Sequence, residues 1–468
     1  MDDLEHQSEL GRATIFALSS GQGRAGVAVI RVSGPSVPAV LISMASPVPR
    51  PRTAGLRLVT APGTGDIIDQ ALVLFFPGPT SQTGEDIAEF QIHGGPAVVA
   101  AMLAALASFP ACRLAEPGEF ARRAFENGKI DLTAAEGLAD LVDAETEAQR
   151  RQALRQAGGV LARLYDSWRS SLIEASALVE AAIDFSDERD VFADAVGRAR
   201  VVVEELRELI AAHLNNGRRG EILRDGFQVA LVGAPNAGKS SLFNALAQRD
   251  AAIVSPEAGT TRDIIEVRLD LGGLSVVLAD TAGLREIGAA VELEGMRRTR
   301  DRARRADLVL WVVDGAEVGS GTSPPSDARL FDTQESPTCE MLVVLTKADL
   351  VPRNKRQDAD ASEFVRVPDV HVSAVTGQGI DRLEKLIASK ASSRIGALEA
   401  PALTQARHRS QLEVCHGALE RFLAGDLDEA ELRAEDLRIA VRALGRITGR
   451  VDVEEVLDHV FGRFCIGK

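Results

Sequence analysis

The spacing of apolar and polar residues divides the chain into regions of different texture. Up to about residue 128, short apolar runs alternate with Gly and Pro, as in the segment Phe76-Pro-Gly-Pro79. Short runs bounded by turn residues are typical of strands and brief helices joined by tight connections. We therefore predict an α+β domain for this region.

A different pattern begins after Asp131. Thr133 and Glu136 have the spacing of a helix capping box, and from there to Phe185 the sequence is rich in Ala and Leu, with apolar positions at helical spacing. A second tract of this texture runs from about residue 407 to residue 460. Because the two tracts flank a region of another type, we expect one helical domain interrupted by an insertion.

The inserted region begins with an apolar run that is typical of a buried strand. Val229 to Val232 lead into Gly233-Ala-Pro-Asn-Ala-Gly-Lys239-Ser240, and Ser241 to Ala247 have the pattern of a helix. Glycines let backbone N–H groups surround a phosphate at the positive end of a helix. Lys239 is expected to reach the β- and γ-phosphates of a nucleotide, and Ser240 to hold Mg²⁺. The alternative is a glycine-rich turn that binds no ligand. The flanking strand and helix favour a phosphate-binding loop, because such a loop requires both.

Further segments follow in the order that a guanine-nucleotide switch needs. Asp280-Thr-Ala-Gly283 offers a carboxylate that reaches Mg²⁺ through water and a glycine N–H for the γ-phosphate. In Thr346-Lys-Ala-Asp349 the last carboxylate can accept two hydrogen bonds from guanine, and Ser373-Ala374 offers a backbone N–H to the guanine oxygen. Gly259-Thr260-Thr261-Arg262-Asp263 supplies a hydroxyl as second Mg²⁺ ligand. A site built to hydrogen-bond guanine rejects adenine, so GTP is expected rather than ATP.

Two positions depart from the usual GTPase pattern. Thr346 stands where an Asn usually ties the guanine-reading segment to the phosphate loop, so weaker anchoring is expected. Leu284 stands where many GTPases place a glutamine that orients the attacking water. Hydrolysis then needs positive charge and a water-positioning group from elsewhere. Candidates for these roles are the acids Glu286, Glu292 and Glu294, and Asn236, whose side-chain oxygen can bind a monovalent cation.

Composition narrows the class without identifying it. The chain has 468 residues, of which 45% are hydrophobic, and its mean hydropathy is +0.01, as expected for about three soluble domains. No apolar run approaches the roughly 18 residues of a membrane span, and no secretion signal is visible, so we expect a cytoplasmic location. Four cysteines without paired spacing and seven scattered histidines argue against a zinc site or a disulfide framework.

Several segments outside the nucleotide site are distinctive. They are Gly23-Arg-Ala-Gly-Val-Ala-Val-Ile-Arg31-Val-Ser-Gly34, Thr83-Gly-Glu-Asp86 with His93-Gly-Gly-Pro96, Arg122-Arg-Ala-Phe-Glu-Asn-Gly-Lys129, and the terminal Phe464-Cys-Ile-Gly-Lys468. Together with the nucleotide-site segments, they resemble one family, the bacterial and organellar tRNA modification GTPases MnmE, also called TrmE. A GTPase pattern alone leaves many families open, whereas these segments together leave one.

The resemblance implies a multidomain α/β chain. It implies an N-terminal α+β domain that binds folate and dimerises (residues 1–128), an all-α helical domain in two parts (129–222 and 391–468), and an inserted Ras-like P-loop GTPase domain (223–390). It also implies a reduced folate of the 5-formyltetrahydrofolate type, held by Arg31, Glu89, Lys129 and Lys468.

In the GTPase part, the resemblance implies a K⁺ ion near Asn236, Ser255, Glu257 and Thr260, and Mg²⁺ on Ser240 and Thr261. Glu292 matches the acid that positions the attacking water, and dimerisation of two GTPase domains completes the K⁺ site. The expected GTP contacts are Asn236, Ala237, Gly238, Lys239, Ser240, Ser241, Ser255, Thr260, Thr261, Asp280, Thr281, Ala282, Gly283, Thr346, Lys347, Asp349, Ser373 and Ala374.

The family works with an FAD-dependent partner, MnmG or GidA. Together they add an aminomethyl or carboxymethylaminomethyl group at carbon 5 of the wobble uridine of certain tRNAs, with a folate as the one-carbon source. GTP hydrolysis drives a conformational change. Two other classes stay open from the residues: a ribosome-assembly GTPase that lacks modification chemistry, and a folate-dependent transferase whose nucleotide site only stabilises the fold.

The net charge of −15 argues against a uniformly basic surface for nucleic acid, so any tRNA contact must be local. Two groups of arginines qualify. The first is Arg150, Arg151 and Arg155 on one expected helix. The second comprises Arg297, Arg298, Arg300, Arg302, Arg304 and Arg305, which the solvated face of a helix explains equally well. The role of Cys465 stays open between reaction and packing.

Overall fold

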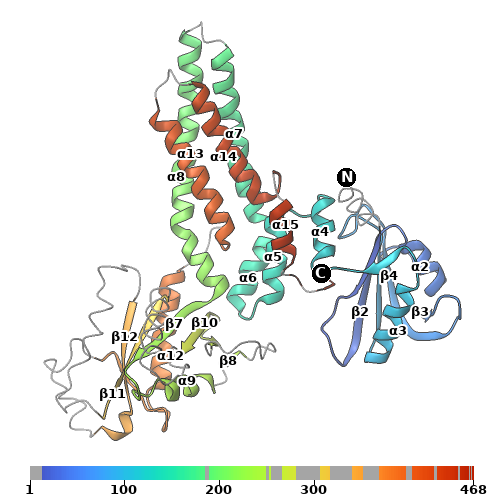
Figure 1. Ribbon diagram of the computed structural model, residues 1–468, viewed down its shortest axis with the longest axis horizontal. Coiled ribbons are helices and arrows are strands. Elements are labelled where there is room, and N and C mark those ends of the chain that lie inside the picture. The colour runs from blue at the N-terminus through green and yellow to red at the C-terminus, as the bar shows by residue number, and fades with distance from the viewer. Residues whose placement is uncertain are drawn as a thin grey trace, which may run out of the picture. The chain divides into compact units, whose positions relative to one another are not determined.

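Figure 1 shows the fold of the chain in a computed structural model. The structure describes residues 13–184, 189–248, 252–253, 266–280, 306–316, 340–351, 368–396, 403–425, 430–451, 454–462, 464 and 466–467. By its internal contacts the chain forms two compact units. One comprises residues 1–139, 156–199 and 426–468, and the other comprises residues 140–155 and 200–425.

The N-terminal part contains a six-stranded sheet of order β3-β4-β5-β2-β1-β6. All neighbouring strands are antiparallel except β1 and β6. Its elements are β1 Thr14–Leu18, β2 Ala25–Ser33, α2 Val37–Met44, β3 Gly55–Thr60, β4 Ile67–Phe76, β5 Ile87–Gly94, α3 Pro96–Ala107, β6 Cys112–Leu114 and α4 Glu119–Glu126.

Side chains of this sheet alternate between a covered and an open face, as the two-residue period of a strand requires. Ile30, Val73 and Phe90 belong to the core that packs with α2 and α3. On the other face, Leu56 and Leu72 are directly opposite each other and are 57% and 42% exposed. This face is therefore apolar and exposed at β3 and β4, whereas Ile15 and Ala17 of β1, on the same face, are buried with Phe120 of α4.

Long helices follow, as the Ala- and Leu-rich tracts predict. They are α5 Leu132–Asp143, α6 Glu147–Ala157, α7 Val160–Asp184, α8 Arg189–Asp225, α13 Ala406–Ala424, α14 Ala430–Thr448 and α15 Glu454–Phe461. The predicted capping box at Thr133 and Glu136 is replaced by another cap. The Asp131 carboxylate accepts the backbone N–H groups of Thr133 and Ala134, at 2.8 and 3.0 Å, one residue before the helix begins.

The inserted region forms a seven-stranded sheet of order β13-β12-β11-β7-β10-β9-β8. The strands from β13 to β10 are parallel, and β9 and β8 continue antiparallel. Its elements are β7 Phe227–Gly233, α9 Lys239–Ala247, β8 Ala252–Ile253, β9 Glu266–Asp270, β10 Ser275–Asp280, β11 Leu308–Asp314, β12 Glu340–Thr346, the 3-10 turn η2 Ala348–Leu350, β13 Val370–His371 and α12 Ile380–Ile395.

Two further observations concern compartment and redox state. Among the described helices, none combines the length and apolar character that crossing a membrane requires. Cys112 and Cys415 are buried free thiols, and burial raises the pKa of Cys415 to about 12, so this thiol stays protonated near neutral pH. Cys339 and Cys465 lie outside the described residues.

Candidate functional site

The phosphate-binding loop joins the end of β7 to the first residue of α9. Asn236 and Gly238 adopt left-handed backbone conformations, with φ of 63° and 90°. A Cβ atom built on Gly238 would lie 3.3 Å from the hydroxyl of Thr346, so this position has little room for a larger residue. The loop ends directly at the N-terminus of α9, where free N–H groups and the helix dipole favour an anion.

Lys239 is the first residue of α9 and its side chain turns back over the loop. Its ammonium group donates to the carbonyl oxygens of Gly233 and Ala234, both at 2.7 Å, and the residue is 9% exposed. The amine is therefore held above the loop whose N–H groups are predicted to surround a phosphate. Ser240 follows on the exposed side of the first helical turn, as expected for the Mg²⁺ ligand.

Parallel strands bring the other predicted segments to the same edge of the sheet. β10 ends at Asp280, beside Leu231 of β7, and β12 ends at Thr346. After β13, Ser373 is buried and its N–H donates to the carbonyl of Gln378 at 2.9 Å, which forms a tight turn that also contains Ala374. Asp349 lies exposed on η2, with its carboxylate open to a ligand.

Thr346 is tied to the phosphate loop by its hydroxyl. Oγ1 lies 2.6 Å from the carbonyl oxygen of Ala237 in the loop and 3.0 Å from that of Val313 at the end of β11. Thr346 is 4% exposed. The single hydroxyl of Thr346 thus makes the connection to the phosphate loop that an Asn amide makes in the usual pattern.

Asp314 is a site residue that sequence reasoning missed. It ends β11 and its carboxylate accepts Lys347 Nζ at 2.5 Å and the N–H of Ala316 at 2.9 Å. Lys347 has a left-handed backbone, with φ of 54°. The signal was available, because Asp314 directly follows an apolar run in the same way as Asp280.

Eight of the twenty residues predicted to contact the nucleotide or metals, or to position water, lie outside the described residues. These are Ser255, Glu257, Thr260, Thr261, Thr281, Ala282, Gly283 and Glu292, together with Leu284 and the neighbouring acids Glu286 and Glu294. Among the residues the structure does describe, no group of three or more His, Cys, Asp or Glu side chains could hold a metal ion.

In the N-terminal sheet, two of the four predicted folate contacts meet. Arg31 of β2 and Glu89 of β5 are directly opposite each other, and the guanidinium donates to the carboxylate at 2.9 and 3.1 Å. Both side chains are about one-fifth exposed, and the guanidinium lies 5.7 Å from the ring centre of Phe120. They lie on the open face of the sheet, because Glu89 is opposite Leu74 and Arg31 alternates with the buried Ile30 and Val32.

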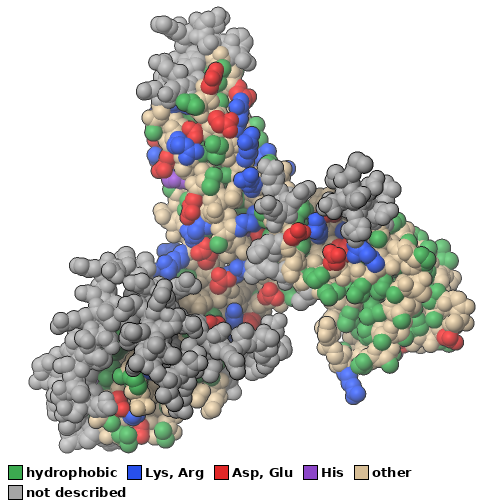
Figure 2. Space-filling view, in the orientation of Figure 1, with side chains coloured by type: hydrophobic (Ala, Val, Ile, Leu, Met, Phe, Trp, Pro, Cys, Tyr) green, Lys and Arg blue, Asp and Glu red, His purple; other side chains and the backbone are tan. Residues whose placement is uncertain are grey.

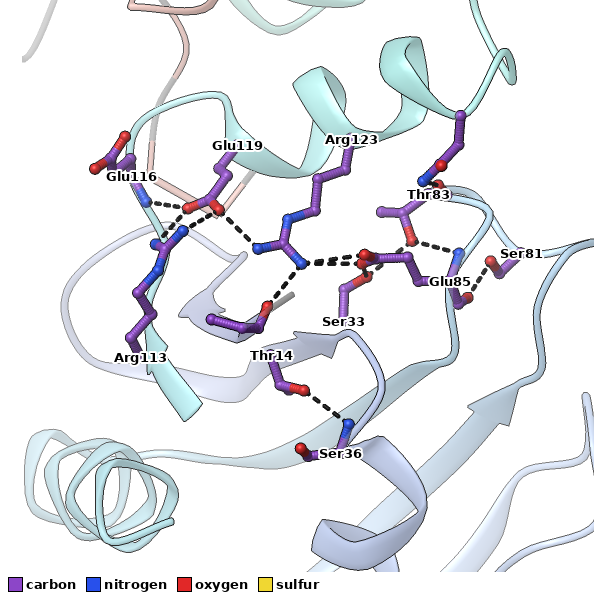
Figure 3. A network of polar contacts seen from close by, with 12 residues as sticks. Thr14, Ser33, Ser36, Ser81, Thr83, Glu85, Arg113, Glu116, Glu119 and Arg123 are labelled. Carbon is purple, nitrogen blue, oxygen red and sulfur yellow. Dashed lines mark hydrogen bonds and ion pairs between the residues drawn. The ribbon is translucent and has the colours of Figure 1, made fainter. Parts of the chain in front are cut away.

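A buried polar network lies next to this pair (Figure 3). Arg123 of α4 donates to Glu85 at 3.1 Å and to Glu119 at 2.9 Å, and Glu85 also accepts the hydroxyl of Ser33 at 2.8 Å. Burial opposes ionisation of Glu119, but hydrogen bonds from Arg113, the Glu116 backbone and Arg123 outweigh it and lower its pKa.

The same network joins two of the segments that carry the family resemblance. Asn127 donates to the carbonyl of Thr83 at 2.7 Å. A Cβ atom on Gly84 would lie 3.1 Å from Cε of Lys129. The side chain of Lys129, the third predicted folate contact, therefore passes directly over this glycine. Sequence reasoning quoted Thr83, Gly84 and Asn127 within these segments but assigned a role to Lys129 alone among the residues named here.

The fourth predicted folate contact, Lys468, lies outside the described residues, whereas its neighbours are anchored. Ile466 pairs with Pro117, and the carbonyl of Gly467 accepts the hydroxyl of Ser19 at 2.9 Å. Gly467 has a φ of 101°, and a Cβ atom there would lie 2.3 Å from the carbonyl oxygen of Leu18. The end of the chain is therefore held at the end of β1.

A phosphate loop between a parallel strand and a helix, with its guanine-reading segment at the adjoining strand ends, defines the class of P-loop GTPases. Two family profiles match the chain: "GTP-binding protein TrmE N-terminus" at residues 14–129 and "MnmE helical domain" at residues 132–465. The chain belongs to the MnmE family of tRNA modification GTPases.

Full-length relatives agree with this assignment. The tRNA modification GTPase MnmE of Parvibaculum lavamentivorans is 53% identical over 97% of this chain and 100% of its own length, and that of Rhodospirillum rubrum is 50% identical over 97% and 99%. Among solved structures, the G domain of the T. maritima FeoB iron transporter is 27% identical over 35% of this chain and 98% of its own, but a TM-score of 0.25 supports no further conclusion. The predicted family, multidomain α/β fold and GTPase class are confirmed.

Proposed function

We propose that this chain hydrolyses GTP to drive a modification of tRNA. With an FAD-dependent partner of the MnmG or GidA type, it would install an aminomethyl or carboxymethylaminomethyl group at carbon 5 of the wobble uridine. The observation that carries the proposal is that one chain holds both a phosphate loop and the Arg31–Glu89 pair, which lies in a domain that matches the family's N-terminal profile. A GTPase that acts only in ribosome assembly has no need for the first site.

In the GTPase part, the phosphate loop would surround the phosphates, with the Lys239 ammonium leaving the two loop carbonyls to meet the β- and γ-oxygens. Ser240, exposed on the first turn of α9, fits Mg²⁺ because a hard cation prefers oxygen ligands. Thr261 would be the second ligand, and Asp349 and the turn at Ser373 and Ala374 would bind guanine.

For hydrolysis, we propose that K⁺ replaces an arginine finger and that Glu292 positions the attacking water. Asn236 supports this, because its left-handed backbone lies in the phosphate loop and its side chain is exposed. An amide oxygen there is a suitable ligand for a hard cation. Ser255, Glu257 and Thr260 would complete the ion's surroundings when two GTPase domains meet.

The N-terminal site suits a reduced folate of the 5-formyltetrahydrofolate type, the one-carbon source. A folate carries carboxylates and a flat ring with donors and acceptors, and here a guanidinium, a carboxylate and the aromatic ring of Phe120 lie together. Lys129 and Lys468 would supply further positive charge. Removing a charge-assisted hydrogen bond costs about 1.5–3 kcal/mol. Arg31→Ala should therefore weaken 5-formyltetrahydrofolate binding about ten-fold or more in calorimetry, whereas Arg163→Ala on α7 should not.

We also propose that the open face of the N-terminal sheet forms a homodimer. Leu56, Leu58 and Leu72 are 57%, 53% and 42% exposed on that face, which is unusual for side chains of this size gathered in one place. Leu58→Glu should convert the dimer to a monomer in light-scattering chromatography. Ile42→Glu is the matched control, because Ile42 is 63% exposed on α2, away from that face. A dimeric Leu58→Glu protein would refute the interface.

The remaining parts of the proposal concern organisation. The boundaries of a folate and dimerisation domain (1–128), a two-part helical domain (129–222 and 391–468) and a GTPase domain (223–390) stay predictions. So do the cytoplasmic location and the assembly with the FAD-dependent partner.

The deciding experiment is mass spectrometry of tRNA nucleosides from cells that lack the protein, rescued by the wild type or by Lys239→Ala. Loss of the carbon-5 wobble modification, restored by the wild type alone, is the expected result. An unchanged nucleoside profile in the deleted cells would overturn the proposal and favour an assembly GTPase.

A further inference from the structure

An RNA contact on this acidic chain has to be local. The structure makes one of the two arginine groups that the sequence indicates less suitable for binding phosphate. On α6, Arg150 and Arg151 both hydrogen-bond to Glu147, at 2.8 and 2.6 Å. These bonds, with that from Arg150 the stronger, lower the pKa of Glu147 to about 2. One ionised carboxylate thus offsets part of the charge of two arginines. The other group, residues 297–305, lies outside the described residues.

A third group of arginines follows the exposed side of α14. Arg438, Arg442 and Arg446 are exposed and spaced by four residues, and Arg450 follows in the turn after the helix, where its N–H donates to Gly445 at 2.8 Å. Residues four apart share a helix face and are about 6 Å apart along the axis. No acidic residue lies between the first and last of these arginines. We call these four residues the arginine stripe.

Two members of the arginine stripe, Arg438 and Arg450, pair with acids of α7, the helix that packs against α14. Arg450 bonds to Asp166 at 2.7 and 2.9 Å, and Arg438 bonds to Glu180 at 3.1 Å and to Glu435 of its own helix at 3.3 Å. The two interhelical contacts show that α7 and α14 run antiparallel. Figure 2 shows Lys and Arg side chains following one another along the part where α7 and α14 lie.

The surroundings of Arg442, in the middle of the arginine stripe, differ from those of its ends. On the part of α7 between the two acids, Ser170, Ile173 and Ala177 are exposed and uncharged, whereas Nε of Arg169 lies 3.6 Å from a Cβ atom built on Gly445 of α14. Arg442 forms no ion pair with any residue that the structure describes. Its guanidinium is therefore open to a ligand.

Helix stability does not account for this arrangement. The helix dipole favours cations in the last turn, but its effect falls off within that turn. Because α14 ends at Thr448, the dipole explains Arg446 but not Arg438 or Arg442. Exposed ion pairs such as those at the ends of the stripe contribute about 0–1 kcal/mol. Four arginines on one line need another explanation.

We propose that the arginine stripe binds the phosphate backbone of tRNA, which rests on the proposed function in tRNA modification. Guanidinium groups match phosphate oxygens with two parallel hydrogen bonds. The regular spacing of the arginines along α14 resembles the regular succession of phosphates along an RNA strand, whereas carboxylates on an acidic protein have no such repeat. Contacts of this kind position the RNA without reading its sequence.

The test compares tRNA binding by three forms of the full chain over a series of KCl concentrations. In Arg442→Ala/Arg446→Ala we expect the Kd for an unmodified tRNA transcript to rise about ten-fold near 0.1 M salt, and the slope of log Kd against log salt to fall by about 2, because two phosphate contacts are lost. Arg442→Lys/Arg446→Lys should keep most of the affinity. Arg382→Ala/Lys385→Ala, on the exposed side of α12, should behave as wild type.

Other readouts separate the possible failures. GTP hydrolysis without tRNA and the circular dichroism of the helices should be unchanged; if helix content falls, Arg442→Ala alone carries the test. Unchanged tRNA affinity and salt slope in the alanine variant, with binding by the wild type, would overturn the stripe and leave the proposed function standing. If the alanine variant keeps its tRNA affinity but binds the FAD-dependent partner more weakly, the arginine stripe binds an acidic protein surface and the RNA proposal is overturned. Absence of tRNA binding by the wild type with its partner would refute the proposed function itself.

Discussion

Thr346 offers the sharpest test of how this nucleotide site is held together. Its hydroxyl is buried between the phosphate loop and β11, 2.6 Å from the carbonyl oxygen of Ala237 and 3.0 Å from that of Val313. Thr346→Val replaces the hydroxyl by a methyl group of similar size. The packing is then nearly unchanged, and the lost interaction is the hydrogen bond.

The magnitude follows from burial. A hydrogen bond contributes about 0.5–1.5 kcal/mol net, and a buried polar group left without its partner costs about 1–3 kcal/mol. The Ala237 carbonyl belongs to the loop that must hold the phosphates, so this cost falls on the bound geometry. At about 1.4 kcal/mol per factor of ten, Thr346→Val should weaken GDP and GTP binding by about 5- to 100-fold.

Stopped-flow release of a fluorescent GDP analogue measures the effect. We expect faster release from Thr346→Val and near-normal release from Thr346→Ser, which keeps the hydroxyl. Thr53→Val is the matched control, because Thr53 is an exposed threonine of the N-terminal part, outside the nucleotide site. Release from Thr346→Val at the wild-type rate would show that the hydroxyl does not anchor the guanine-reading segment to the loop.

Four further predictions address the remaining groups. Lys239→Ala should abolish GTP binding in equilibrium titration, while Lys385→Ala on α12 binds normally. Glu292→Ala should bind GTP with wild-type affinity yet hydrolyse it slowly, and hydrolysis at the wild-type rate would exclude its role in positioning water. Replacing K⁺ by Na⁺ at constant ionic strength should slow wild-type hydrolysis sharply, and equal rates in the two salts would exclude a role for K⁺. Burial, and to a smaller extent the nearby His408, lower the pKa of His213 from 6.5 to about 4. Between these pH values the unfolded chain binds a proton at His213 that the folded chain does not, so the free energy of unfolding should fall by up to about 3 kcal/mol as pH drops from 6.5 to 4. Urea unfolding of wild type and His213→Gln should show a flatter pH profile in the variant.

The nucleotide site could be predicted largely from sequence because its residues follow apolar runs. Parallel strands bring their carboxyl ends to one edge of the sheet. The position of Lys239, Asp280 and Thr346 at that edge can therefore be predicted without knowing the distances between paired strands. Asp314 could have been found by the same rule. It was missed because no pattern assigns a role to an acid that acts through a neighbouring lysine.

The N-terminal site depended on resemblance, since its contacts join residues far apart in the chain. Arg31 and Glu89 are separated by 58 residues and meet only because β2 pairs with β5 in one particular register. A shift of one residue would place them on opposite faces of the sheet. The buried ion pairs of Arg123 likewise depend on where α4 packs, which hydrophobic spacing does not specify.

The nucleotide part contains a contact of the same hidden kind, between α6 and the hairpin of β9 and β10. Ala148 donates its N–H to the carbonyl of Gly273 at 3.4 Å, and Arg268 lies 3.4 Å from Glu145. β9 begins just after the predicted first switch segment, and β10 ends at Asp280, where the second begins. The two segments that are predicted to respond to the γ-phosphate are therefore each joined directly to a strand of the hairpin that touches α6. Their spacing in the sequence gave no sign of this, because a contact across more than 120 residues depends on how the sheet is assembled.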